Sequence, residues 1–303
     1  MPFKNQMLDY IRREGVRFLY VRFDHNANPA LIRWFAHLKK LGVRIVMEIP
    51  TFPYDPEYAR ASRKTKLVLS VDKCFRNALA RQVDRIVTFS QYDTIFGRPT
   101  IRISNGIDFA HIPLKTNVND TSNTVHLLGV ADIHFWHGFD RVVAGLADYY
   151  RRPHEKEVIF HIVGGGSRFT VPELREQVRE QGMEERVVLH GPLWGEALDR
   201  AFEEADLGIA SLGRHRNGIT HIKTLKNREY AARGIPFVYS ENDSDFDAMP
   251  YVLKAPADES PIDIDALLHF LDGVDRDPAH IRASIEDTLS WDVQMRMVLD
   301  QIE

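Results

Sequence analysis

The amino-acid sequence predicts an α/β protein that contains two doubly wound parallel β-sheets. Runs rich in Val, Ile and Phe alternate with amphipathic segments along the 303 residues. This is the pattern of βαβ units whose strands are buried on both faces. A polar stretch at 116–123 interrupts the alternation and is typical of a linker. The length and the hydrophobic content of 44% fit two domains with sizeable cores.

The predicted elements follow one another in a regular order. In the first half, strands are expected at 16–23, 43–49, 85–90 and 100–104, and helices near 5–14, 28–41 and 68–82. In the second half, strands are expected at 125–130, 158–164, 186–191, 207–211, 236–240 and 251–255, with helices between nearly every pair. The helix before the strand at 236–240 ends at Gly234, because Pro236 cannot continue it. We therefore expect a first domain at 1–112, a second at 113–285, and a C-terminal helix at 286–303 that packs back toward the first domain.

Charge is distributed unevenly between the two halves. Residues 1–112 contain 19 basic and 10 acidic side chains, whereas residues 113–303 contain 20 basic and 33 acidic ones. The basic first half suits an anionic partner such as a lipid headgroup or a pyrophosphate. Within it, Arg63, Lys64 and Lys66 precede the apolar run LVLSV. This segment fits either a membrane surface or an ordinary solvated helix face.

Composition also bears on the cellular compartment. The single cysteine, Cys74, excludes an intramolecular disulfide framework and a cysteine-cluster metal site, and it fits a reducing cytosol. No run approaches the roughly 18 apolar residues of a membrane span, and the first residues lack the apolar core of a signal peptide. We expect a cytoplasmic protein that is at most peripheral at the inner face of the membrane, with no nucleic-acid partner.

The residues that follow the strands of the second half form the candidate site. In open parallel sheets, ligands collect beyond the carboxyl ends of the strands. Gly165 and Gly166 belong to a glycine triplet at the end of the expected strand at 158–164. The missing side chains let backbone N–H groups approach a phosphate there. A plain turn is the alternative. Leu193 follows the strand at 186–191 and offers an apolar edge to a nucleobase.

A polar, basic loop at 212–225 enters the helix that carries Glu229. Arg216, Lys226 and the positive end of the helix dipole can neutralise two phosphates, while Glu229 can accept two hydrogen bonds from a ribose diol. Alternatively, Glu229 only favours the helix dipole, and Lys226 only pairs with Glu229 one turn away. The combination predicts a nucleoside diphosphate ligand.

Five segments occur in a characteristic order and spacing. They are SNGID (104–108), WHGFD (136–140), VGGGS (163–167), LHGPL (189–193) and REYAARGIPFVY (228–239). Together they resemble the retaining GT-B glycosyltransferases of family 4, most of all a bacterial subgroup associated with polysaccharide assembly, over residues 40–303. The resemblance implies two Rossmann-like domains facing a cleft, with a nucleotide-sugar donor held by the second and a glycan or lipid-linked acceptor held by the first. It further implies a hexosyltransferase that needs no metal or cofactor, in which the departing phosphate assists front-side attack.

The resemblance assigns donor-binding roles to two positions of the last segment and the loop before it. Glu229 matches the glutamate that binds the donor ribose. His221 stands where the family has a glutamate that contacts the donor sugar, which is a departure. A catalytically impaired donor-binding or scaffolding subunit is therefore one alternative, and a nucleotide-sugar epimerase on the same fold is another.

A second departure concerns the diphosphate. His137 replaces the basic residue that the family has before Gly138, and the arginine expected a few residues upstream falls near Ala131. The diphosphate charge is then left to Lys226, Arg216 or His137. His137 can act as a neutral hydrogen-bond donor, since the unperturbed pKa of histidine is about 6.5.

The acceptor side is expected in the first half, directly after the strand at 43–49. Glu48, Thr51 and Tyr54 lie in a segment whose two prolines fix the backbone, which suits an acceptor platform or simply a rigid loop. The family's first domain normally begins with further elements before a strand such as 16–23, so this domain is expected to be truncated. A partner subunit, a second copy or a membrane surface would then cover the exposed edge, or activity would be impaired.

Overall fold

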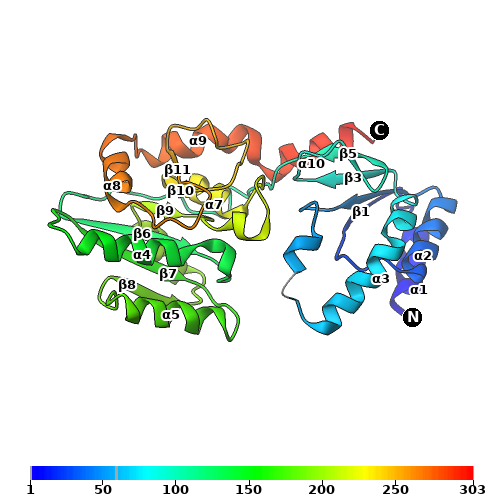
Figure 1. Ribbon diagram of the computed structural model, residues 1–303. Coiled ribbons are helices and arrows are strands. Elements are labelled where there is room, and N and C mark those ends of the chain that lie inside the picture. The colour runs from blue at the N-terminus through cyan, green and yellow to red at the C-terminus, as the bar shows by residue number, and fades with distance from the viewer. Residues whose placement is uncertain (1, 59–60, 303) are drawn as a thin grey trace. The chain divides into compact units, whose positions relative to one another are not determined.

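The computed structural model describes residues 2–58 and 61–302 and contains two sheets whose main strands run parallel (Figure 1). Contacts group the chain into unit 1, residues 1–104 and 295–303, and unit 2, residues 105–294. The boundary predicted from sequence followed residue 112. The segment 105–112 belongs to unit 2 because Ile107 N donates to Leu289 O at 2.7 Å and Arg282 Nη1 donates to Ile112 O at 3.0 Å.

The end of the chain forms two helices in place of the single helix expected at 286–303. These are α9 (Pro278–Leu289) and α10 (Trp291–Asp300), separated by Ser290. Residues from Met295 onward group with unit 1.

Unit 1 has a five-stranded sheet in the order β1-β2-β3-β5-β4. Its elements are α1 (Pro2–Arg13), β1 (Phe18–Arg22), α2 (Pro29–Lys40), β2 (Arg44–Glu48), the 3-10 turn η1 (Asp55–Tyr58), α3 (Arg63–Ala80), β3 (Arg85–Thr88), β4 (Thr94–Ile95) and β5 (Arg98–Arg102). Asn28 caps α2 by accepting a hydrogen bond from Leu31 N at 3.0 Å. The core packs Phe35 and Leu38 of α2 against the sheet.

Two features of unit 1 differ from the sequence prediction. α3 begins at Arg63, earlier than the predicted residue 68, because the Ser62 side chain accepts a hydrogen bond from Thr65 N at 3.2 Å and caps the helix. β4 was not predicted. It pairs antiparallel with β5 through a two-residue turn in which Phe96 and Gly97 both have positive φ, at 50° and 72°.

Unit 2 has a six-stranded parallel sheet in the order β11-β10-β9-β6-β7-β8. Its strands are β6 (Thr124–Val130), β7 (Glu157–Val163), β8 (Val187–Gly191), β9 (Leu207–Ile209), β10 (Phe237–Tyr239) and β11 (Val252–Lys254). Its remaining helices are α4 (Phe139–Tyr150), α5 (Thr170–Glu180), α6 (Glu196–Glu204), α7 (Leu225–Arg233) and α8 (Ile264–Gly273). The prediction of two parallel sheets is confirmed.

Both faces of the unit 2 sheet are covered. One core packs α4, α5 and α8 against the sheet, and a second packs α6, α7 and α9. Successive residues of β10 alternate between the cores, with Val238 in the first and Phe237 and Tyr239 in the second, as strand geometry requires. None of the helices within the described residues combines the length and the apolarity that crossing a lipid bilayer requires.

Three histidines on adjacent strands form a hydrogen-bonded row. His126 Nδ1 lies 3.0 Å from His161 Nε2, and His161 Nδ1 lies 2.9 Å from His190 Nε2. Burial, and then the neighbouring rings, lower the pKa of His161 to about 4. The folded state therefore binds fewer protons than the unfolded state between about pH 4 and 6.5, and its stability falls as the pH drops through this window.

We expect His161→Gln to reduce this acid sensitivity, because glutamine can hydrogen-bond but does not titrate. The free energy of unfolding should depend less on pH between 4 and 7, by about 2 kcal/mol, after allowance for partial solvent screening. Urea unfolding at the two pH values measures the difference. The exposed His154, changed to Gln, is the control, and an identical pH dependence in His161→Gln and the wild type would contradict the assignment.

Candidate functional site

The strand order of unit 2 creates a switch point. β6 lies between β7 and β9, so the chain leaves β6 to one side and later returns to its other side. Ligands bind at the carboxyl ends of the strands that flank such a reversal. Two 3-10 turns occupy these ends: η2 (Phe135–His137) follows β6, and η3 (Arg214–Asn217) follows β9. Leu212 N donates to His137 O at 2.9 Å, so the two predicted loops are joined.

His137 is buried at this point and electrically neutral. Its Nδ1 accepts a hydrogen bond from His134 N at 3.0 Å, which leaves the ring proton on Nε2. Burial, followed by the charges of Lys226 and Arg214, strongly lowers the pKa of His137. The Nε2–H group is therefore a permanent donor. Gly138 allows this geometry, since it has φ 68° and an added Cβ would lie 2.7 Å from the Leu212 carbonyl carbon.

Lys226 lies in the first turn of α7, where the helix dipole is positive. Thr224 caps this helix by accepting a hydrogen bond from Asn227 N at 3.4 Å. Burial and the charge of Arg214 lower the pKa of Lys226, and Glu241 acts in the opposite direction. The same lysine and arginine affect His137, so these cations gather around the carboxyl ends of β6 and β9.

Arg216 has internal partners. Its guanidinium donates to both oxygens of Asp140, at 2.8 and 2.5 Å, to the Glu259 carboxylate at 2.6–3.1 Å, and to Phe135 O at 2.7 Å. These contacts use all three nitrogens of the guanidinium. The hydrogen bonds to Asp140, and then those to Glu259, raise the pKa of Arg216. Arg216 thus links η3 to the start of α4, while Arg214 of the same turn lies 5.5 Å from the Trp136 ring.

Sequence reasoning missed Glu241, which follows β10. Its carboxylate is 3% exposed, and neither oxygen accepts a hydrogen bond from another residue of the described chain. Burial raises its pKa, while Arg214 and Lys226 oppose this. Among the described residues, the Ser211 hydroxyl after β9 and both amide atoms of Asn217 also lack partners although they are buried. The only sequence signal was the position of these residues after strands.

The glycine turn follows β7 as predicted. Gly164 has φ 135°, and a Cβ there would lie 1.7 Å from Ala131 O, so the turn packs against the end of β6. Gly165 O accepts a hydrogen bond from Ile133 N at 2.6 Å, and Gly165 has open space where a side chain would be. Gly166 is exposed and bridges Ile133. Of the three glycines, Gly165 is the one where no atom lies within 4 Å of the position of a Cβ.

Leu193 and His221 lie in loops with different surroundings. Leu193 is half-buried and packs against the core beneath α6 and α7. His221 is exposed, with its ring 3.0 Å from the Thr220 hydroxyl, and its backbone bridges Asn242. The structure therefore places position 221 beside the segment that carries Glu241.

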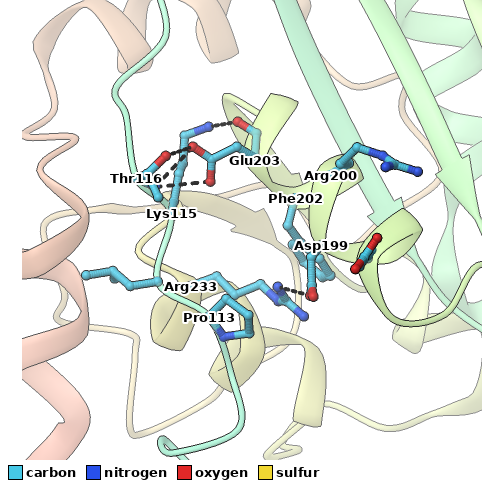
Figure 2. Close-up of a pocket in the computed structure, with 10 residues that line it drawn as sticks. Pro113, Lys115, Thr116, Asp199, Arg200, Phe202, Glu203 and Arg233 are labelled. Carbon is cyan, nitrogen blue, oxygen red and sulfur yellow. Dashed lines mark hydrogen bonds and ion pairs between the residues drawn. The ribbon is translucent and has the colours of Figure 1, made fainter.

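Glu229 is held in place by Arg233, one turn further along α7. Arg233 Nε donates to Glu229 Oε1 at 3.2 Å, and Arg233 Nη1 donates to Asp199 at 2.8 Å. The guanidinium also lies 3.9 Å from the Phe202 ring centroid. Figure 2 shows Arg233 reaching Asp199 at a pocket of about 420 Å³ that Phe202 and residues 113–116 also line. The side chain of Glu229 is 31% exposed and so remains reachable by a ligand.

The predicted acceptor residues lie in unit 1. Glu48 is buried, accepts a hydrogen bond from Tyr20 OH at 2.6 Å and pairs with Arg22 at 2.9 Å. Tyr54 is also buried and donates to Asp72 at 2.7 Å. Thr51 is half-buried in the loop between them. Within the described parts of the chain, no group of three or more His, Cys, Asp or Glu side chains is arranged to hold a metal ion.

Near Tyr54, the structure reveals a residue that sequence reasoning did not single out. His25 follows β1, has a positive φ of 47° and stacks on the Tyr54 ring at 3.7 Å between centroids. Its Nδ1 lies 2.7 Å from Tyr58 OH, while its buried Nε2 has no partner in the described chain. Burial lowers the pKa of His25. Left-handed backbone in a non-glycine residue often marks a functional position.

Comparison with known proteins gives matches in structure alone. No family model matches the chain, and no curated protein matches its sequence. The sucrose-phosphate synthase of Thermosynechococcus elongatus is 16% identical, with a TM-score of 0.66 over 99% of this chain and 77% of that one. HepE of Anabaena, solved with UDP-glucose, is 17% identical, with a TM-score of 0.67 over 99% of this chain and 82% of that one.

A glycosyltransferase of Rickettsia africae gives a similar match. It is 11% identical, with a TM-score of 0.65 over 98% of this chain and 79% of that one. Each alignment spans both units of this chain and most of the neighbour. The two parallel sheets and these likenesses together establish that the chain has the GT-B fold, with two Rossmann-like domains.

Proposed function

We propose that this protein is a retaining glycosyltransferase that moves a hexose from a nucleoside diphosphate sugar to a glycan or lipid-linked acceptor in polysaccharide biosynthesis. The observation that carries the proposal is the cationic site at the switch point of unit 2. There the α7 N-terminus, Lys226 and the donor Nε2–H of His137 meet at the ends of β6 and β9. The glycosyltransferase neighbours, one solved with UDP-glucose, support the same reading.

In this mechanism the protein stabilises charge that develops on the leaving group. The bond between the anomeric carbon and the diphosphate oxygen breaks, and its electron pair goes to the diphosphate. The acceptor oxygen bonds to the anomeric carbon from the same face, and its proton passes to the departing phosphate. Lys226, Arg214, His137 Nε2–H and the open backbone of the glycine turn are suited to stabilise the diphosphate.

Two further parts of the proposal concern the donor and the charge balance. Glu229, fixed by Arg233, is suited to accept hydrogen bonds from the donor ribose. The cations of the protein replace a metal ion, so we propose metal-independent catalysis with no cofactor. Arg216 has a structural part in this scheme, since its guanidinium is bound to Asp140 and Glu259.

The test is incubation with a panel of UDP, GDP and ADP sugars in the presence of EDTA. Transfer or hydrolysis releases the nucleoside diphosphate, epimerisation changes only the sugar, and a scaffolding subunit does neither. The non-catalytic alternative is tested as well because His221, which is exposed, stands where the family has a glutamate. In parallel, a nucleotide present at about 100 times its Kd should stabilise the fold by about 2.7 kcal/mol. If no nucleotide stabilises the protein, the proposed donor site is wrong.

We also propose that unit 1 contacts the cytoplasmic membrane surface through α3. The apolar side chains Leu67, Val68 and Val71 are 68%, 44% and 40% exposed on this helix. The surrounding Arg63, Lys64, Lys66 and Lys73 are exposed as well. Apolar side chains flanked by cations fit an anionic bilayer surface, where a lipid-linked acceptor would be found.

Leu67→Glu should weaken binding to vesicles that contain anionic phosphatidylglycerol by about tenfold or more. The substitution removes the burial of a leucine in the bilayer and adds a repelled charge. Vesicle co-sedimentation measures the effect. Leu41, which is exposed at the end of α2, provides the control Leu41→Glu. Equal vesicle binding by the two variants would exclude α3 as the contact.

A further inference from the structure

Glu241 is a buried carboxylate that accepts no hydrogen bond from any other residue of the described chain. It lies two residues after the end of β10 and is 3% exposed. Native proteins rarely bury a carboxylate in this way, because the group loses its hydration and gains nothing in return. A group retained at this cost at the carboxyl end of a strand is expected to meet hydrogen-bond donors from a ligand.

Two other polar groups without partners come from the neighbouring loop. Ser211 follows β9, and Ser240 N donates to Ser211 O at 3.0 Å, so the ends of β9 and β10 are joined beside Glu241. The Ser211 hydroxyl is fully buried and lacks a partner in the described chain. Asn217, at the end of η3, has an amide whose nitrogen and oxygen are both unpartnered within the described residues. Three adjacent segments thus supply unused hydrogen-bonding groups.

Cations lie on one side of this group. Lys226 and Arg214 both act on Glu241 through space, and the same two cations act on His137. Neither oxygen of Glu241 accepts a hydrogen bond from Lys226, although the lysine acts on it electrostatically. The nearby Asp243 is different, because Arg228 pairs with it at 2.7 Å. Of these two carboxylates after β10, Glu241 is the one without a hydrogen bond from another residue of the described chain.

This arrangement defines the chemistry of its ligand. The carboxylate needs hydrogen-bond donors, the hydroxyl and the amide pair with groups that both donate and accept, and the adjoining cations attract an anion. A sugar joined to a diphosphate presents both within a few bonds. Resting on the proposed function, we infer that Glu241 binds the hydroxyl groups of the donor sugar, and that Ser211 and Asn217 complete this subsite.

Backbone hydrogen bonds place Glu241 close to position 221, where the family has its sugar-binding glutamate. Asn242 N donates to Thr220 O at 2.7 Å, and Ile222 N donates to Asn242 O at 3.0 Å. These bonds tie the segment around His221 to the residue after Glu241. The carboxylate that the resemblance led us to expect at position 221 is thus supplied from the β10 side, by the neighbouring segment.

The test separates recognition of the sugar from recognition of the nucleotide. Titration calorimetry of wild type and Glu241→Gln uses UDP, GDP, UDP-glucose, UDP-N-acetylglucosamine and GDP-mannose as probes. Glu241→Gln should bind the preferred nucleoside diphosphate within about twofold of wild type. It should bind the corresponding nucleotide sugar about tenfold to a hundredfold more weakly, the range of hydrogen bonds to a charged group. Exposed Glu204 of α6, changed to Gln, is the control and should bind both like wild type.

Each other outcome overturns the inference. If Glu241→Gln binds the nucleotide sugar as wild type does, Glu241 does not contact the sugar. If it loses the nucleoside diphosphate equally, Glu241 acts on the nucleotide or on folding. If wild type binds the nucleoside diphosphate but no nucleotide sugar, the sugar subsite is wrong while the nucleotide site stands. If wild type binds none of the probes, the proposed function fails as well.

Thermal unfolding gives a second readout that guards against misfolding. Without ligand, Glu241→Gln should melt at a temperature equal to or higher than that of wild type, because a buried carboxylate without partners has been neutralised. With the nucleotide sugar, its rise in Tm should shrink to that produced by the nucleoside diphosphate alone. A full rise in Tm with the nucleotide sugar would overturn the inference.

Discussion

Replacing Lys226 with alanine should lower kcat by about 10²–10³-fold while the protein stays folded. The residue lies at the α7 N-terminus, and burial lowers its pKa, so its charge acts in a poorly hydrated site. If it stabilises the departing diphosphate, its loss should cost about two to four kcal/mol of transition-state stabilisation, the range measured for a preorganised electrostatic donor.

The measurement is steady-state turnover at saturating donor, with release of the nucleoside diphosphate as the signal. Lys40, an exposed lysine in the last turn of α2, provides the matched control Lys40→Ala. A variant with unchanged kcat and a raised KM would make Lys226 a ground-state binding group, and unchanged kcat and KM would remove it from the site.

The pH dependence of this variant offers an independent check. Burial, and then the charge of Lys226, lower the pKa of His137, so removal of Lys226 should raise that pKa while burial keeps it below its ordinary value. An NMR titration of His137 would report the shift directly.

The fold was accessible from sequence because it depends on local pattern. Buried parallel strands read as short apolar runs, and all the main strands of both units were predicted within a few residues. β4 was missed because it has only two residues and depends on the turn at Phe96 and Gly97. The first boundary was placed too late because the backbone bonds of Ile107 and Ile112 join segments far apart in the chain.

The site was only partly accessible, because its electrostatics depend on residues distant in sequence. Strand ends identified Lys226, His137 and the glycine turn as neighbours. Nothing in the sequence near Arg216 indicates that Asp140 and Glu259 bind it. Likewise, Glu241 lies in a polar segment that reads as an ordinary loop, and the next residue is tied to the distant segment 220–222 by backbone hydrogen bonds.

The stability of the region around the α7 N-terminus depends on a buried cation, Arg228 of α7. Its side chain is fully buried and pairs with Asp243 at 2.7 Å and with Asp245. It also donates to Asn105 O at 3.0 Å and to Thr224 O at 2.9 Å. Arg228 thus joins the start of unit 2, the cap of α7 and the loop after β10, so its loss should disturb all three.

Arg228→Ala should destabilise the protein by about 3–5 kcal/mol, because Asp243 would be left buried without its cation. Burial already raises the pKa of Asp243, and the substitution should raise it further. When the folded pKa of a carboxyl group lies above its unfolded value, the free energy of unfolding falls as the pH rises. The variant should therefore recover part of the loss in mild acid.

Urea unfolding of Arg179→Ala, which breaks the exposed pair with Glu176 on α5, is the control. Its free energy of unfolding should change by less than about 1 kcal/mol. Arg228→Met combined with Asp243→Leu should regain much of the stability, since it removes both charges. If Arg228→Ala costs no more than Arg179→Ala, the buried ion pair does not hold this region together.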